Sequence, residues 1–144
     1  MGSFRNSVTI DRPPREVFAF VANFENVPTW NYAIEETRKR TPGPTTVGTE
    51  YVQRRGVPQP GEERFTVTEL VADRAVAIDG TLGPFPARLR YEVEPAGTGT
   101  VLTNDVELEL SGPLRLAGPV VTSRVKAAVA ENLQVLKLRL EAAS

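Results

Sequence analysis

Alternating apolar and polar residues run from about Val47 to Leu110, interrupted by short turn sequences. Alternation of this kind is typical of β-strands that bury one face and expose the other. The turns are expected at Pro58–Gly61, Asp73–Arg74, Gly83–Pro84 and Ala96–Gly99. Antiparallel pairing across these turns collects nearly every apolar strand residue on one face, and a slip of one residue would reverse the faces of a strand. The sequence therefore predicts an antiparallel meander with one buried and one solvated face.

One amphipathic segment, from about Pro119 to Glu141, follows the meander. Its apolar residues recur at helical spacing and are Val121, Val125, Val129, Leu133, Leu136 and Leu140. Val135 and Leu138 fall outside this stripe, so either the apolar arc is wide or the helix contacts a partner. Because the buried face of the sheet has no other cover long enough, we expect this helix to lie across it. A curved sheet closed over one long helix leaves room for a small molecule.

The segment before the meander is expected to form a strand, two short helical elements and a further strand. Alternation over Phe4–Ile10 predicts the first strand, and apolar spacing predicts a helix over about Pro14–Asn23. Asn26–Trp30 is expected to be a second helical turn capped by Asn26, followed by a strand over about Tyr32–Lys39. The chain of 144 residues fits one domain, residues 1–144, with a core of its own.

Composition excludes several classes of function. The 17 basic and 18 acidic residues are spread along the chain, which gives no electrostatic case for binding nucleic acid. No apolar run is long enough for a signal peptide or a membrane span, so we expect a cytoplasmic protein. Histidine and cysteine are absent, which excludes a Ser-His-Asp triad, thiol catalysis and the usual zinc or iron ligands. We expect neither a metal site nor a cofactor.

Six polar residues are expected to face inward: Tyr51, Gln53, Glu69, Tyr91 and Asn104 of the sheet, and Asn132 of the helix. A buried polar group without a partner costs about 1–3 kcal/mol, so each requires an explanation. The predicted register places Glu69 near Ile78, in an apolar lining that would raise the pKa of its carboxyl. That environment suits a general acid or base. Alternatively, Glu69 lies at a rim, pairs with Arg55 or Arg88, or turns outward at a break in the alternation.

The remaining polar candidates each have two interpretations. The predicted register pairs Gln53 with Phe65 and Tyr91 with Asn104. Tyr91 and Asn104 could together hold a ligand carbonyl, or they could satisfy each other as a structural pair. Asn132 could line a pocket or hydrogen-bond the end of a strand. Trp30 follows a proline-containing turn near the expected mouth and is either a core residue or a wall of the ligand site.

The stretches with a recognisable family pattern are Ile10–Phe18, Asn26–Asn31, Val47–Tyr51, Gly83–Phe85 and Leu110–Leu114. With the order of the predicted elements, they resemble the START/Bet v 1-like (SRPBCC) superfamily, in its bacterial polyketide cyclase/dehydrase branch. The resemblance implies an α+β helix-grip fold, with a curved antiparallel sheet of about seven strands wrapped on the long C-terminal helix and two short helices after the first strand. It implies a ligand pocket between helix and sheet, near Trp30, Tyr51, Gln53, Glu69, Tyr91, Asn104 and Asn132. The superfamily has no shared catalytic motif.

Two functions from different classes remain open at this point. The first is binding of a hydrophobic small molecule, polyketide- or lipid-like, which requires only a cavity and a few orienting polar groups. The second is a cofactor-independent polyketide cyclase or dehydratase, in which Glu69 moves the proton while Tyr91 and Asn104 steady an enolate oxygen. A third, non-catalytic interpretation makes the wide helix arc a partner surface. Both a monomer and a homodimer are compatible with the sequence.

Overall fold

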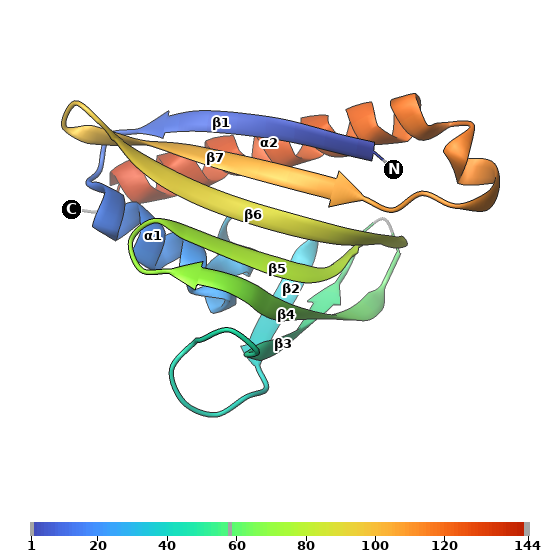
Figure 1. Cartoon of the computed structure of the whole chain (residues 1–144), viewed down its shortest axis with the longest axis horizontal. Coiled ribbons are helices and arrows are strands. Elements are labelled where there is room, and N and C mark those ends of the chain that lie inside the picture. The colour runs from blue at the N-terminus through green and yellow to red at the C-terminus, as the bar shows by residue number, and fades with distance from the viewer. Residues whose placement is uncertain (1, 58, 143–144) are drawn as a thin grey trace.

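The computed structural model describes residues 2–57 and 59–142. Seven strands form one antiparallel sheet in the order β1-β7-β6-β5-β4-β3-β2. The strands are β1 (Gly2–Ile10), β2 (Ile34–Lys39), β3 (Glu50–Arg55), β4 (Gly61–Val71), β5 (Ala75–Leu82), β6 (Phe85–Ala96) and β7 (Gly99–Leu108). The helices are α1 (Pro14–Ala22), the 3-10 helices η1 (Phe24–Thr29) and η2 (Gly112–Arg115), and the long α2 (Gly118–Ala142). The predicted element order and the predicted curved sheet on a C-terminal helix are confirmed (Figure 1).

The first two strands occupy opposite edges of the sheet, and α1 and η1 carry the chain between them. Pro14 begins α1, where a missing N–H costs no helical hydrogen bond. The side chain of Asn23 caps η1 by accepting a hydrogen bond from the Glu25 N–H. The prediction that Asn26 is the cap is therefore wrong. Instead, the Asn26 side chain donates to the Phe20 carbonyl over 3.2 Å and ties η1 to α1.

The long helix α2 packs along β1, on the inner side of the sheet (Figure 1). Leu133, Leu136 and Leu140 of its C-terminal half are buried, as the apolar stripe predicts. Val135 and Leu138 are 42% and 65% exposed, so they lie outside the apolar stripe. The valines of the N-terminal half, Val121, Val125 and Val129, are only partly buried. The C-terminal half of α2 is thus a core element, whereas its N-terminal half covers the sheet more loosely.

The register predicted for the last three strands is confirmed, since Tyr91 pairs with both Val76 and Asn104. The pairing predicted for β3 and β4 is displaced by two residues: Tyr51 faces Phe65, and Gln53 faces Glu63. A displacement of two keeps every side chain on its predicted face. It arises because the two strands pair around a turn centred one residue earlier than predicted, with Arg55 opposite Gly61. Pro58, which belongs to that turn, lies outside the described residues.

A β-bulge interrupts the pairing of β4 with β5. Val67 pairs with Ile78 and Glu69 pairs with Ala77, so Thr68 is the extra residue on β4. A bulge opposes two residues to one and reverses the alternation beyond it. Leu70 therefore packs against the core, and Val71 is exposed. The same reversal moves Glu69 from the inner to the outer face of the sheet, so the prediction that Glu69 faces inward, near Ile78, is wrong.

Candidate functional site

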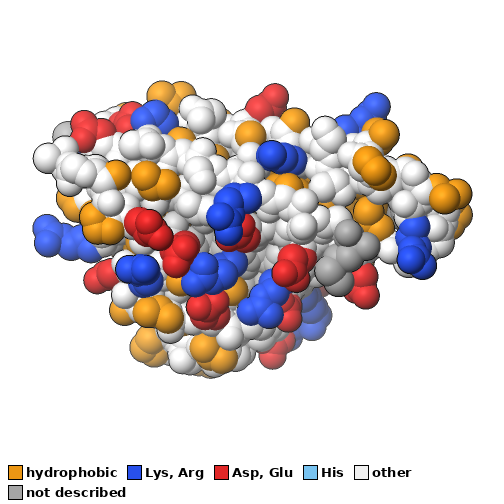
Figure 2. All heavy atoms as spheres, turned by 45° about the horizontal axis from the view of Figure 1, so that its top comes forward, with side chains coloured by type: hydrophobic (Ala, Val, Ile, Leu, Met, Phe, Trp, Pro, Cys, Tyr) orange, Lys and Arg blue, Asp and Glu red, His pale blue; other side chains and the backbone are white. Residues whose placement is uncertain are grey.

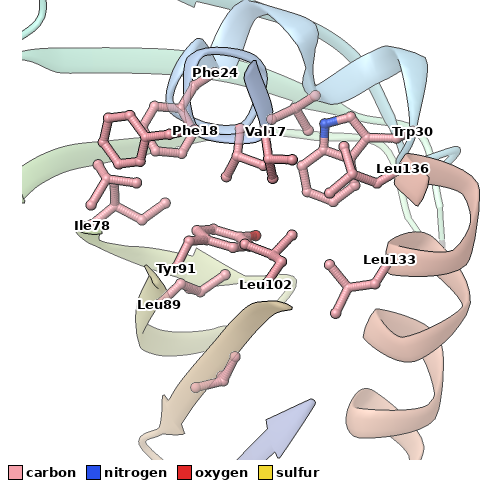
Figure 3. Packing of buried hydrophobic residues seen from close by; sticks show 14 of the residues in the cluster. Val17, Phe18, Phe24, Trp30, Ile78, Leu89, Tyr91, Leu102, Leu133 and Leu136 are labelled. Atoms are coloured by element: carbon pink, nitrogen blue, oxygen red, sulfur yellow. The ribbon is translucent and has the colours of Figure 1, made fainter. Parts of the chain in front are cut away.

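A cavity of about 360 Å³ lies between the inner face of the sheet and α2. Its apolar walls come from η1 and the residue that follows it (Phe24, Val27, Trp30), from the strands (Phe65, Ile78, Leu89, Tyr91) and from the loosely packed half of α2 (Val125, Val129). Figure 3 shows Val17 and Trp30 facing Tyr91 across the interior, with Leu133 and Leu136 of α2 closing one side. The period-two alternation of β4, β5 and β6 explains why one face of these strands supplies the floor.

Gly80 allows the floor of the cavity to form. A Cβ at this position would lie 2.6 Å from the Cβ of Phe65 and 2.9 Å from the carbonyl oxygen of Arg64. Real Cβ atoms do not approach other atoms so closely, so a larger residue would push β5 away from Phe65. Gly80 lines the cavity beside Thr81 and Leu82, close to the Gly83–Pro84 turn. The two-residue connection between β5 and β6 thus borders the cavity as a hairpin.

Trp30 and Tyr91 form an edge-to-face aromatic pair on the cavity wall. Their ring centroids are 6.4 Å apart and their planes are 88° to each other, an arrangement that aromatic quadrupoles favour. The indole Nε1 of Trp30 is buried without an acceptor. In the described part of the chain, the Tyr91 hydroxyl has no hydrogen-bond partner either. Burial raises the pKa of the Tyr91 hydroxyl far above its usual value, so this group remains protonated at neutral pH.

Asn132 adds a polar group from the opposite wall. It is buried on α2, one residue before Leu133, and it lines the cavity. Within residues 2–57 and 59–142, no hydrogen bond satisfies its side-chain amide. Asn132 therefore lines the pocket, which is one of the two roles predicted for it. Three separate segments thus bring polar groups to one cavity: the indole N–H of Trp30, the hydroxyl of Tyr91 and the side-chain amide of Asn132.

A buried polar cluster forms the β3–β4 end of the cavity. The Arg55 guanidinium donates from Nε to Glu63 Oε2 over 2.7 Å and from Nη2 to Glu63 Oε1 over 3.1 Å. Gln53 Nε2 donates to the same Oε1 over 2.9 Å, and the Thr37 hydroxyl approaches Gln53 Oε1 at 3.5 Å. Gln53 and Arg55 line the cavity. Sequence reasoning identified Gln53 but missed Arg55 and Glu63, although the alternation Tyr51, Gln53, Arg55 already placed Arg55 on the inner face.

Glu69 lies on the outer face of the sheet, away from the cavity. Arg90 Nε donates to its Oε1 over 2.9 Å, and Arg90 Nη2 donates to its Oε2 over 3.3 Å. The hydrogen bonds from Arg90 lower the pKa of the Glu69 carboxyl, the opposite of the expected shift. Basic and acidic side chains are interspersed on the face drawn in Figure 2, and neither sign forms a patch of its own. Glu69 thus belongs to the solvated charge network, as one of its alternative interpretations anticipated.

Tyr51 and Asn104 are buried but do not line the cavity. The Tyr51 ring stacks on Phe65 with centroids 5.1 Å apart, and its hydroxyl shares a hydrogen bond of 2.7 Å with Thr45 Oγ1. The Asn104 amide donates to the Arg90 carbonyl over 3.4 Å, while its Oδ1 is buried without a partner. Of the seven predicted site residues, four line the cavity: Trp30, Gln53, Tyr91 and Asn132.

Two other kinds of site are missing from residues 2–57 and 59–142. No helix there combines the length and the hydropathy needed to cross a bilayer. No three acidic side chains converge closely enough there to hold a metal ion.

Comparison with known proteins places these features in a family. A family model described as polyketide cyclase/dehydrase and lipid transport matches residues 1–141. The protein TTHA0849 from Thermus thermophilus superposes with a TM-score of 0.81, at 18% identity and 99% coverage of both chains. A START superfamily protein from Mycobacterium smegmatis gives the same four values. The di-domain ARO/CYC BexL from the BE-7585A biosynthetic pathway superposes with a TM-score of 0.80 at 16% identity, over 98% of this chain and 47% of that one.

These identities are low, so the superpositions establish the fold, which is a START-like helix-grip. A search of the curated proteins finds no sequence match.

Proposed function

Because this chain belongs to the polyketide cyclase/dehydrase and lipid transport family, we propose that it binds one compact hydrophobic molecule, polyketide- or lipid-like, between the sheet and α2. The observation that carries the proposal is the cavity of about 360 Å³, with apolar walls and a few polar groups that lack protein partners. Pockets for small molecules have this composition and measure roughly 300–1,000 Å³. A volume near the lower limit favours a ligand of a few fused rings over a long acyl chain.

Apolar contact supplies the affinity in this proposal, and the polar groups supply orientation. Each Å² of apolar surface removed from water contributes about 25 cal/mol before the costs of association. The Tyr91 hydroxyl and the Asn132 amide would then hydrogen-bond oxygen atoms of the ligand. Satisfying these buried groups adds specificity, because a ligand without matching oxygens would leave them unpaired.

Binding is better supported than cyclisation or dehydration. Those reactions require a group that moves a proton. The titratable side chains on the described cavity wall are Tyr32, Arg55 and Tyr91. A carboxylate is not among them, and the position of Glu69 on the outer face removes the general acid or base expected from the sequence.

The proposal can be tested with the neutral fluorescent probe N-phenyl-1-naphthylamine. Val129 lines the cavity, so Val129→Trp would fill part of it from the helix side. Val135→Trp is the matched control, because Val135 is exposed on the same helix. We expect Val129→Trp to weaken probe binding about tenfold or more, and Val135→Trp to leave it unchanged. Equal affinities in both variants, or no probe binding by the natural protein, would contradict the proposed function.

A further inference from the structure

The ion pair between Arg55 and Glu63 closes one end of the cavity and is already formed without a ligand. Its Nε–Oε2 distance is 2.7 Å, and the two side chains are 10% and 9% exposed. Glu63 also accepts a hydrogen bond from Gln53, so three N–H groups satisfy its carboxylate. Arg55 lines the cavity and Glu63 does not. A molecule in the cavity therefore meets the guanidinium, with the carboxylate behind it.

Part of the Arg55 guanidinium remains available. An arginine side chain carries five N–H groups in a fixed planar fork. Two of them donate to Glu63, and Nη1 makes only a long contact of 3.5 Å with the Val57 carbonyl. The remaining N–H groups have no acceptor within residues 2–57 and 59–142. Each Arg55 nitrogen already donates once, so these additional N–H groups are free to donate to an oxygen atom of a ligand that reaches this end of the cavity.

The charge of the pair decides what kind of oxygen fits. The guanidinium and the carboxylate sum to zero, so the pair offers donors without a net positive charge. A carboxylate ligand would bring a second negative charge close to Glu63 and would also lose its hydration in a largely apolar cavity. A ketone, quinone or ester oxygen accepts the same hydrogen bond and carries no charge.

From this geometry we propose that the Arg55–Glu63 end of the cavity recognises a neutral carbonyl group of the ligand and discriminates against a free carboxylate. The inference rests on the proposed function and narrows it to carbonyl-bearing hydrophobic molecules, which excludes free fatty acids.

Three naphthalenes of similar shape test this selectivity: 2-acetylnaphthalene, 2-naphthoate and the hydrocarbon 2-isopropylnaphthalene. Their affinities are measured at pH 7 by displacement of N-phenyl-1-naphthylamine. For the natural protein, we expect the ketone to bind about tenfold more tightly than the carboxylate and several-fold more tightly than the hydrocarbon. A carboxylate that binds as tightly as the ketone would overturn the proposal.

Two variants assign the selectivity to the ion pair. Glu63→Gln leaves Arg55 with a net positive charge, so naphthoate affinity should rise about tenfold while ketone affinity stays within about threefold. The double variant Arg55→Met/Glu63→Met replaces the buried pair by apolar side chains, an exchange that proteins often tolerate. In that variant the ketone should lose its advantage over the hydrocarbon. Unchanged naphthoate affinity in Glu63→Gln would overturn the proposal even if the double variant failed to fold.

The outcomes separate this inference from the function on which it rests. If all three naphthalenes displace the probe equally well, the cavity binds hydrophobic molecules without recognising a carbonyl group. In that case only the further inference fails. If none displaces the probe and the probe itself does not bind, the proposed function fails as well.

Discussion

Arg90 holds Glu69 on the outer face of the sheet through two hydrogen bonds, of 2.9 and 3.3 Å. The residue between them in the sheet is Ala77, which pairs with both. A small side chain at this position lets Arg90 reach across one strand to the carboxylate. Both partners are about one-third exposed, at 31% and 32%.

Glu69→Gln is therefore expected to leave ligand binding unchanged and to cost little stability. A pair as exposed as this one contributes about 0–1 kcal/mol, and glutamine retains an acceptor for Arg90. Urea denaturation and titration with N-phenyl-1-naphthylamine measure the two quantities. Glu109→Gln, an exposed residue next to the end of β7, is the control for removal of a negative charge. A loss of probe affinity in Glu69→Gln, but not in Glu109→Gln, would show that Glu69 contributes to the ligand site.

The lowered pKa of Glu69 predicts how its contribution depends on pH. Hydrogen bonds from Arg90 hold this pKa below its ordinary value of 4.5, so the folded state favours the ionised form. The stabilisation is then complete above the unfolded pKa and disappears as the pH falls through the folded pKa. We expect the difference in unfolding free energy between the natural protein and Glu69→Gln to be constant from pH 7 to about 5 and to shrink as the pH falls below the ordinary pKa of 4.5. A difference that grew on acidification would contradict this sign.

Tyr91 and Tyr51 form a natural pair of test positions, because one lines the cavity and the other does not. Tyr91→Phe removes a hydroxyl without a protein partner, so stability should be unchanged. The affinity for 6-acetyl-2-naphthol, which carries two oxygens, should fall about 3- to 10-fold. Tyr51→Phe loses the hydrogen bond to Thr45, so it should cost about 0.5–1.5 kcal/mol of stability and leave that affinity unchanged. The reverse pattern would place the ligand beside Tyr51.

Gly80→Ala is expected to destabilise the protein and to distort the cavity floor. Its Cβ would lie 2.6 Å from the Phe65 Cβ, and overpacking of this kind costs about 1–3 kcal/mol. Gly61→Ala is the matched control on the neighbouring strand, since nothing lies within 4 Å of its added Cβ. Thermal unfolding should separate the two variants clearly. Equal melting temperatures would show that β5 shifts without cost.

Sequence reasoning succeeded where alternation is uninterrupted. In β6 the apolar residues Leu89, Tyr91 and Val93 leave one choice of face, and short turns on either side of this strand fix the pairs of Tyr91 with Val76 and Asn104. It failed at Glu69 because Leu70 and Val71 are both apolar, so either could continue the inner face. The bulge at Thr68 turns Leu70 toward the core and the Glu69 carboxylate toward the outer face, and burial of an unpaired charge costs far more than a bulge. The same comparison of costs could have indicated the bulge from sequence alone.

The polar end of the cavity was only half predictable. Gln53 was placed on the inner face, but the assumed turn was centred one residue too far along the chain and gave Gln53 the apolar neighbour Phe65 instead of Glu63. The position of a turn depends on where the two strands stop pairing, which the local sequence between Arg55 and Gly61 does not specify. The alternation placed Arg55 on the inner face as well, but without Glu63 opposite Gln53 its ion-pair partner could not be identified.

The pairing of β1 with β7 has a consequence for folding. Residues 2–10 pair with residues 100–108, and the Arg5–Asp105 ion pair joins the same two strands. During synthesis the first strand therefore has no partner until the whole meander up to β7 has followed it. Contacts between residues so distant in sequence slow folding, because the entropy of closing a long loop is lost before they form. We expect the N-terminal strand to gain amide protection among the last segments in refolding, once the rest of the meander is already ordered.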